Sequence, residues 1–131
     1  MSQATRRRVF VVDDEHTIAS STAMILRQQG FNATFFTQPL EALQAARSES
    51  PDLLLSDVAM PLLSGIDLAI QVKKSCPSCK ILLFSGQAAT SNMLNAARAN
   101  GHNFEILSKP VHPTELLRKI QKSFDFLPEQ S

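Results

Sequence analysis

The sequence predicts a doubly wound α/β domain, in which five parallel strands form one sheet and helices cover both of its faces. Three observations lead to this prediction. Apolar runs of strand length alternate five times with segments of helical periodicity along the 131-residue chain. The short runs are apolar at nearly every position, as in parallel strands that are buried on both faces. Regular strand–helix alternation with right-handed crossovers produces a parallel sheet.

The strands are expected at the short apolar runs, which occupy residues 8–12, 33–36, 53–56, 80–84 and 104–107. Gly30 and Gly101 stand where helices should end, because glycine readily adopts the left-handed conformation found there. Thr37 is a candidate cap for the second helix, with Pro39 in its first turn. Pro113 opens the last helix, and the apolar positions of that helix form one stripe: Leu116, Leu117, Ile120, Phe124 and Leu127.

Five strands suit the order 2-1-3-4-5 of flavodoxin-like folds, in which ligands bind at the switch point between strands 1 and 3. The chain is long enough to bury the core of one domain. We expect residues 1–6 to form a flexible lead, residues 7–126 the domain and residues 127–131 a tail. Because the chain ends soon after the fifth helix, we expect no attached output domain.

Composition argues against several classes of protein. The chain is 44% hydrophobic and 19% charged, as is typical of a soluble globular domain. Its net charge of +1 offers no electrostatic attraction to nucleic acid or to an acidic membrane surface. We interpret Arg6-Arg7-Arg8 as a solvated lead-in, with a partner contact as the alternative. No apolar run approaches the ~20 residues that cross a bilayer and no secretory signal is evident, so we expect a cytoplasmic protein.

Residues suited to phosphate chemistry stand at the ends of four expected strands. Asp13 and Asp14 come directly after the first strand, and Asp57 follows the third. Ser85 ends the fourth strand, and Lys109 follows the fifth. Because the carboxyl ends of parallel strands meet at one edge of a sheet, we expect these side chains to converge. Helix capping by the first two acids is the alternative, but it does not account for the other three residues.

Three carboxylates and one ammonium group form a site for a divalent cation and a phosphoryl group. Mg²⁺ binds through one or two carboxylates and leaves positions for phosphate oxygens. Asp57 is the candidate nucleophile, because a carboxylate can attack phosphorus and form an aspartyl phosphate. The cation and Lys109 can then neutralise the charge on the phosphoryl oxygens. The Ser85 hydroxyl can donate a hydrogen bond to one of those oxygens.

These residues occur in motifs through which residues 7–126 resemble the receiver domains of response regulators in two-component signalling. The matching segments are Val12-Asp13-Asp14-Glu15, Ser56-Asp57-Val58-Ala59-Met60-Pro61 with Gly65 beyond it, Phe84-Ser85-Gly86 and Ser108-Lys109-Pro110. Each motif is weak alone, and together they are highly specific. The resemblance implies that Asp57 is the phospho-acceptor. It also implies that Asp14 binds Mg²⁺ directly, that Asp13 binds it largely through water, and that the backbone carbonyl of Ala59 completes the metal contacts.

The resemblance also implies roles for the remaining site residues and for partners. Ser85 would be the hydroxyl switch and Lys109 the phosphate-binding cation, with a cis peptide bond before Pro110. The donor would be a phosphohistidine on a sensor histidine kinase or on a histidine phosphotransfer protein. The output would be the docking of an unknown downstream protein on helix 4, strand 5 and helix 5. Such a domain is a self-phosphorylating and self-dephosphorylating switch rather than a turnover enzyme.

Two features bear on how this switch would operate. The family usually has an aromatic residue three positions before the lysine, where this chain has Ile106. Either Ile106 and Phe104 are both core side chains, or a bulge lets Phe104 take the switch role. We expect intact phosphorylation with an atypical change near helix 4 and strand 5. Gln87 could hold an attacking water beside the uncrowded Ala59, which is compatible with self-dephosphorylation.

Two other functions, and one other motif, remain as alternatives. A receiver-like scaffold would signal without phosphate, and the isoleucine at position 106 is compatible with it. A phosphohydrolase would use Asp57 as a transient nucleophile, but Ala59 cannot supply the second acid that this reaction needs. Cys76 and Cys79 have the C-x-x-C spacing of redox and zinc motifs. They follow a helix instead of preceding one, which is the wrong end for lowering a thiol pKa.

Overall fold

The computed structural model describes residues 6–86, 90–102, 104–109 and 111–125. The strands are β1 (Arg8–Val12), β2 (Asn32–Phe36), β3 (Leu53–Asp57), β4 (Lys80–Ser85) and β5 (Glu105–Ser108). The helices are α1 (His16–Gln28), α2 (Pro39–Ser48), α3 (Gly65–Ser75), α4 (Thr90–Ala99) and α5 (Pro113–Asp125). Every strand predicted from the sequence is present, and each boundary lies within one residue of its predicted place.

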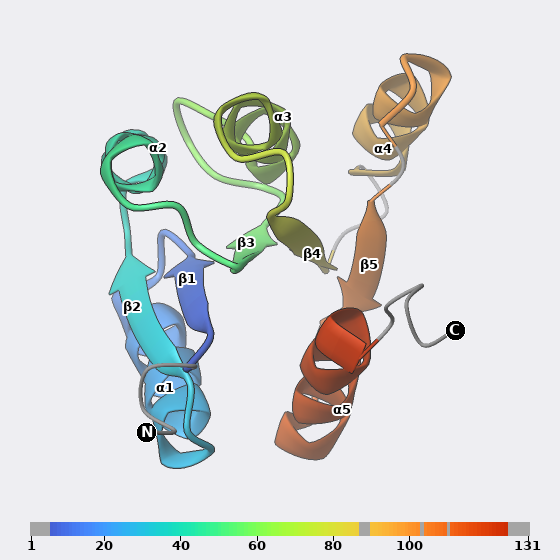
Figure 1. The fold of residues 1–131 in the computed structure, drawn as a ribbon. Helices are drawn as coiled ribbons and strands as arrows, with labels where there is room; N and C mark the ends of the chain where they lie inside the picture. Colours follow the sequence, from blue (N-terminus) through green and yellow to red (C-terminus); the bar gives the residue numbers. More distant parts are fainter. Residues whose placement is uncertain (1–5, 87–89, 103, 110, 126–131) are drawn as a thin grey trace.

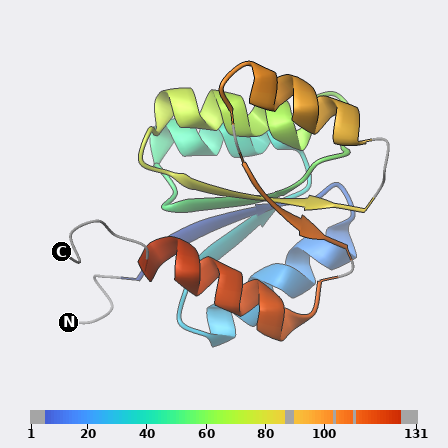
Figure 2. The ribbon, with the colours of Figure 1, turned by 90° about the vertical axis from the view of Figure 1, so that its right-hand side faces the viewer.

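The five strands form one parallel sheet in the order β2-β1-β3-β4-β5 (Figure 1). Helices α2, α3 and α4 cover one face of this sheet, and α1 and α5 cover the other (Figure 2). The predicted fold class and strand order are therefore confirmed. None of the helices in the described ranges is long and apolar enough to cross a membrane.

A hydrophobic core lies on each face of the sheet, which explains why the strands are apolar throughout. In β1, Phe10 and Val12 belong to the core under α2, α3 and α4. The alternate residues Val9 and Val11 belong to the core under α1 and α5. Successive side chains of a strand point to opposite faces, so both sets of positions must be apolar.

The helix boundaries follow the predicted punctuation with one exception. Gly30 and Gly101 have φ of 93° and 91° just beyond α1 and α4, as expected for left-handed helix ends. The second helix begins at Pro39, but its N-cap residue is Gln38, so the prediction of Thr37 as the cap was wrong by one residue. Proline at the first helical position fixes where that helix begins, and the residue before it becomes the cap.

Helix α5 packs through the predicted stripe. Leu116, Ile120 and Phe124 are buried in the core that α5 shares with α1, and Leu117 packs against it. Leu127 lies outside the described residues.

The basic run before and within β1 makes contacts inside the domain. The Arg7 guanidinium lies 4.6 Å from the centre of the Phe124 ring of α5. Arg8 is the first residue of β1, and its guanidinium lies 3.7 Å from the Glu49 carboxylate. Arg6 and Arg7 are exposed to solvent, in agreement with the interpretation of a solvated lead-in, whereas Arg8 is half-buried and belongs to the sheet.

Candidate functional site

The strand register brings the predicted site residues to one edge of the sheet. Strands β1 and β3 pair in parallel as far as Val12 with Ser56, and the next residue of each chain segment is Asp13 or Asp57. In β4 and β5, Ser85 pairs with Ser108. The backbone N–H of Lys109 then donates to the Ser85 carbonyl at 3.0 Å. The predicted convergence of strand ends is confirmed, and it follows from backbone pairing alone.

The three carboxylates form a compact cluster. Asp13, Asp14 and Asp57 each offer an oxygen that lies within 4.8 Å of the others. Asp13 is 1% exposed and Asp57 7% exposed, whereas Asp14 is open to solvent. The Lys109 ammonium lies 3.0 Å from an Asp57 oxygen and 3.4 Å from an Asp13 oxygen. Three carboxylates around one ammonium leave an excess of negative charge, and their oxygens suit a hard divalent cation such as Mg²⁺.

Helix capping does not explain these acids. The N-cap residue of α1 is Glu15, and its side chain makes no capping hydrogen bond. The backbone N–H of Glu15 donates to the Asp13 carboxylate at 3.0 Å. The other oxygen of Asp13 faces Lys109. Asp13 is thus held by a local turn in an orientation that keeps one oxygen directed into the cluster.

The loop after Asp57 is held tightly by a glycine. The Gly65 N–H donates to the Val58 carbonyl at 2.8 Å, and the Ser56 hydroxyl donates to the Asp57 carbonyl at 3.0 Å. A Cβ atom at position 65 would overlap the Asp57 carbonyl oxygen. The sequence marked Gly65 only as part of a family motif, because the close approach of the two backbones is visible only in the folded chain.

The ionisation of the central pair reflects burial and charge. Burial is the largest influence on Asp57 and raises the pKa of its carboxyl above the ordinary value; Lys109 opposes this rise, and the charges of Asp13 and Asp14 add to it. Burial alone would lower the pKa of Lys109, but the carboxylates of Asp57 and Asp13 outweigh burial and raise it. Lys109 therefore stays positively charged. Burial and the two neighbouring carboxylates make the negative charge of ionised Asp57 less favourable, and Lys109 compensates for part of this effect.

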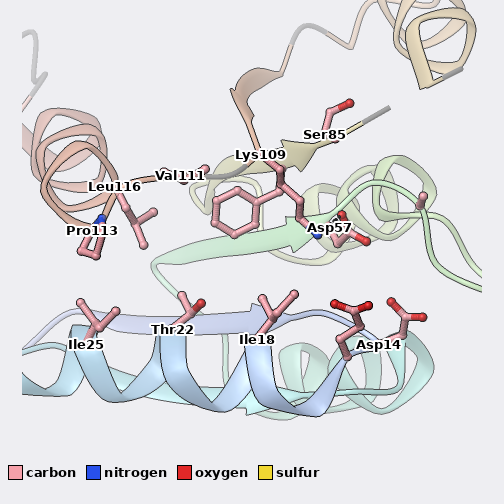
Figure 3. A pocket seen from close by; sticks show the side chains of 14 residues that line it. Asp14, Ile18, Thr22, Ile25, Asp57, Ser85, Lys109, Val111, Pro113 and Leu116 are labelled. Atoms are coloured by element: carbon pink, nitrogen blue, oxygen red, sulfur yellow. Dashed lines mark ion pairs between the residues drawn. The ribbon is translucent and has the colours of Figure 1, made fainter. Parts of the chain in front are cut away.

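A cavity of about 700 Å³ extends from Asp57 into the space between α1 and α5 (Figure 3). Ser85 and Ala59 line it at the acidic end. The far end is mostly apolar and is formed by Ile18, Thr22 and Ile25 of α1 with Val111, Pro113 and Leu116 on the opposite wall. The phospho-acceptor candidate thus lines one end of a channel whose walls on both sides are mostly apolar.

Sequence reasoning did not identify this channel. Its α1 wall has the spacing i, i+4, i+7, and it lies one residue away from the buried stripe of Ala19, Ala23 and Leu26. A helix that packs only against the sheet needs a single stripe of buried residues. The second, adjacent stripe on this helix is the sequence signal that could have indicated the channel.

Four sequence-based expectations about the site are not decided by the described residues. Gln87 and Pro110 lie outside those residues. The role of the Ala59 carbonyl as a metal ligand stays a prediction. Ser85 lies in the cavity lining, and its part in a phosphate-driven switch also stays a prediction.

Strand β5 bears on the aromatic position that departs from the family pattern. β4 and β5 pair one-to-one at four successive positions, from Leu82 with Glu105 to Ser85 with Ser108. The ladder over these residues contains no bulge, which argues against a bulge that moves Phe104 toward Ser85. Phe104 and Ile106 are both half-buried and pack against the core under α2, α3 and α4. This favours the interpretation of both as core side chains.

The two cysteines are buried in the fold. Cys76 is the C-cap residue of α3, and its thiol lies 3.3 Å from the Ser50 hydroxyl. Burial raises the pKa of the Cys79 thiol to about 12. A buried thiol that does not ionise is a poor nucleophile and a poor metal ligand. The structure therefore supports the sequence-based preference against a redox or zinc role.

Cys79 is expected to resist alkylation in the native protein. At pH 8, a thiol with a pKa of about 12 is ionised in only about one molecule in ten thousand, so iodoacetamide should modify it far more slowly than in urea-unfolded chain. Peptide mass mapping of samples quenched over time measures the two rates. Similar rates in native and unfolded protein would contradict the burial described above.

Comparison with known proteins identifies the family to which this fold belongs. The family model described as the response regulator receiver domain matches residues 9–121. The chain belongs to this family. Receiver domains of response regulators obtain phosphate from histidine kinases in two-component signalling, and such domains typically bind Mg²⁺ at a cluster of acidic residues. The cluster of Asp13, Asp14 and Asp57 fits that chemistry.

Curated relatives of this receiver include proteins of different lengths. It is 29% identical over 116 residues to the response regulator receiver protein CpdR of Brucella abortus, covering 88% of this chain and 95% of that protein. It is 30% identical over 113 residues to the probable transcriptional regulatory protein TcrX of Mycobacterium tuberculosis, covering 86% of this chain and 47% of that protein. The chain spans about half the length of several curated relatives that it matches.

Solved structures share the whole fold of this receiver. A CheY-like response regulator receiver domain protein of Methanospirillum hungatei has a TM-score of 0.85 at 28% identity, covering 97% of this chain and 100% of that chain. The chemotaxis protein CheY4 of Vibrio cholerae has a TM-score of 0.80 at 25% identity, covering 91% of this chain and 99% of that chain.

Proposed function

We propose that Asp57 accepts a phosphoryl group from a phosphohistidine of a sensor kinase or phosphotransfer protein. The observation that carries this proposal is the position of the nearly buried Asp57 carboxylate, beside two further carboxylates and 3.0 Å from the Lys109 ammonium. In this proposal Asp13, Asp14, Asp57 and the Ala59 carbonyl hold Mg²⁺. The protein acts in the cytoplasm as a stoichiometric switch, and phosphorylation changes a docking surface formed by α4, β5 and α5.

The chain's own residues account for the proposed transfer. An Asp57 carboxylate oxygen attacks phosphorus, the phosphorus–nitrogen bond of the donor breaks, and its electron pair stays on the imidazole nitrogen. Lys109 exchanges its contact with the carboxylate for a contact with phosphoryl oxygens, and Ser85 donates its hydroxyl hydrogen to one of them. Bound Mg²⁺ would supply further neutralisation of the phosphoryl charge.

The channel between α1 and α5 supports a protein donor. Asp57 lines its acidic end, while its walls present apolar side chains from the α1 side and the α5 side (Figure 3). An apolar surface beside the reactive carboxylate can bury part of a donor helix and hold the phosphohistidine in line with the attacking oxygen.

Phosphorylation with a small donor tests the proposal. Purified protein incubated with acetyl phosphate and Mg²⁺ is expected to gain the mass of one phosphoryl group, in an adduct that alkali removes. Omission of Mg²⁺ with added chelator should prevent the gain, and borohydride trapping with peptide mapping should locate the group at Asp57. No adduct at saturating donor would favour a phosphate-independent scaffold, and rapid turnover of unrelated phosphate esters would favour a hydrolase.

Lys109→Met is expected to affect cation binding and phosphorylation in opposite directions. Loss of the ammonium that contacts Asp57 and Asp13 leaves the carboxylates uncompensated, so the affinity for Mg²⁺ should rise several-fold. The rate of phosphorylation by acetyl phosphate should fall by about 10²-fold, because a charge that stabilises the transition state is missing. Calorimetric titration and intact-mass kinetics measure the two effects. The matched variant Lys119→Met, in an ion pair with Glu105, should change neither.

A further inference from the structure

A second cleft, of about 680 Å³, lies away from the phospho-acceptor. Its lining includes Lys73, Lys80, His102, Phe104, Lys119 and Lys122. Lys80 begins β4, whereas Ser85 at the acceptor site ends it. The six residues of that strand place the two ends roughly 16 Å apart, which exceeds the screening length of about 8 Å at physiological salt. The cleft is therefore a separate electrostatic environment.

The lining of the cleft has a larger excess of positive charge than the chain as a whole. Four lysines and one acid, Glu105, line it, which is an excess of three positive charges in a chain of net charge +1. Glu105 is already paired with Lys119 at 2.7 Å. Lys73 donates to the Pro77 carbonyl at 3.0 Å, a contact that leaves its charge uncompensated. Among the described residues, neither Lys80 nor Lys122 has an ion-pair partner.

The lining of the cleft adds aromatic and apolar surface to this charge. The rings of His102 and Phe104 are stacked, with centroids 6.0 Å apart and an interplanar angle of 15°. Ile81 lies beside them in the lining. A small inorganic anion would use the ammonium groups but not this surface, whereas a peptide that combines acidic side chains with an aromatic or aliphatic one would use both.

We propose that this cleft binds an acidic segment of a partner protein. This assignment deepens the proposed function and rests on its docking surface, because Glu105 belongs to β5 and Lys119 and Lys122 belong to α5. None of the lining residues belongs to the acceptor site. The ammonium groups recognise carboxylates on either side of an apolar side chain that packs on Phe104. Recognition of this kind attracts the partner electrostatically and weakens with salt.

A labelled-protein titration tests the proposal directly. The probe is a blocked pentapeptide with two glutamates on each side of a phenylalanine, titrated into ¹⁵N-labelled full-length protein at low salt. Saturable amide shifts are expected at the residues that line the cleft, in wild type and equally in Asp57→Asn. The double variant Lys80→Glu/Lys122→Glu should lower the affinity about tenfold, because two attractions become repulsions.

Controls separate this proposal from its alternatives. Lys74→Glu/Arg47→Glu makes the same change in net charge at exposed positions outside the lining, and it should leave the affinity within about twofold of wild type. Unchanged acetyl-phosphate labelling shows that each variant is folded. An equal loss in both double variants would overturn the proposal in favour of bulk charge. Tighter binding of tripolyphosphate than of the peptide would assign the cleft to a free anion, and sedimentation of a dimer that Lys80→Glu/Lys122→Glu disrupts would assign it to a second copy of this chain.

Discussion

Asp57→Asn is expected to abolish the phosphoryl adduct and to leave the folded protein at least as stable as the wild type. The amide cannot attack phosphorus, so the loss should be complete. Stability should not fall, because burial raises the pKa of this carboxyl above its ordinary value of 3.8. A raised pKa means that ionisation is less favourable in the folded state than in the unfolded state, and the neutral amide avoids that cost.

The sign of this effect gives a pH-dependent readout. Between pH 3.8 and the raised folded pKa, the folded wild type holds more protons at Asp57 than the unfolded chain does. This group's contribution to stability therefore falls as pH rises through that window and stays low above it. Thermal unfolding of wild type and Asp57→Asn without Mg²⁺, from pH 4 to pH 7, should show the midpoint difference growing in favour of the variant.

Asp67→Asn is the matched control for this prediction, because Asp67 is an exposed carboxylate on α3 outside the cluster. It should be phosphorylated normally. A marked fall in the unfolding midpoint of Asp57→Asn would show that the ion pair with Lys109 stabilises the fold more than the burial of the carboxylate destabilises it. A residual adduct in that variant would place the acceptor on another residue.

Gly65→Ala is expected to destabilise the protein by about 1–3 kcal/mol and to slow phosphorylation in the fraction that remains folded. The added methyl group would overlap the Asp57 carbonyl oxygen, which is backbone and cannot rotate away. The loop must therefore move, and with it the residue that carries the reactive carboxylate. Urea unfolding gives the change in free energy, and intact-mass kinetics with acetyl phosphate give the change in rate.

Gly86→Ala is the control for this second prediction. A Cβ there would lie 3.3 Å from the Cβ of Lys109, so its nearest neighbour is a side chain and not backbone. Its effect on the free energy of unfolding should be clearly smaller than that of Gly65→Ala. Equal destabilisation by both substitutions would mean that backbone approach at position 65 is not the cause.

Several parts of this receiver were predictable because they depend on local patterns. Parallel strands covered on both faces are apolar throughout, so each strand could be located within one residue. The residue after each strand then becomes a residue of the sheet edge, which is how Asp13, Asp57 and Lys109 could be grouped before their distances were known. The helix cap at Gln38 was misplaced by one position, because Thr37 has the better capping chemistry while Pro39 decides where the helix begins.

The sequence by itself determined the fold class, the strand order and the identity of the residues that converge at the acceptor site. Only the tertiary structure decided the contact between Lys109 and two carboxylates, the requirement for glycine at position 65, the channel between α1 and α5 and the basic cleft around Phe104. The physical reason is that periodicity and strand ends are properties of neighbouring residues. The shape and charge of a surface depend on segments that meet only after the helices have packed on the sheet.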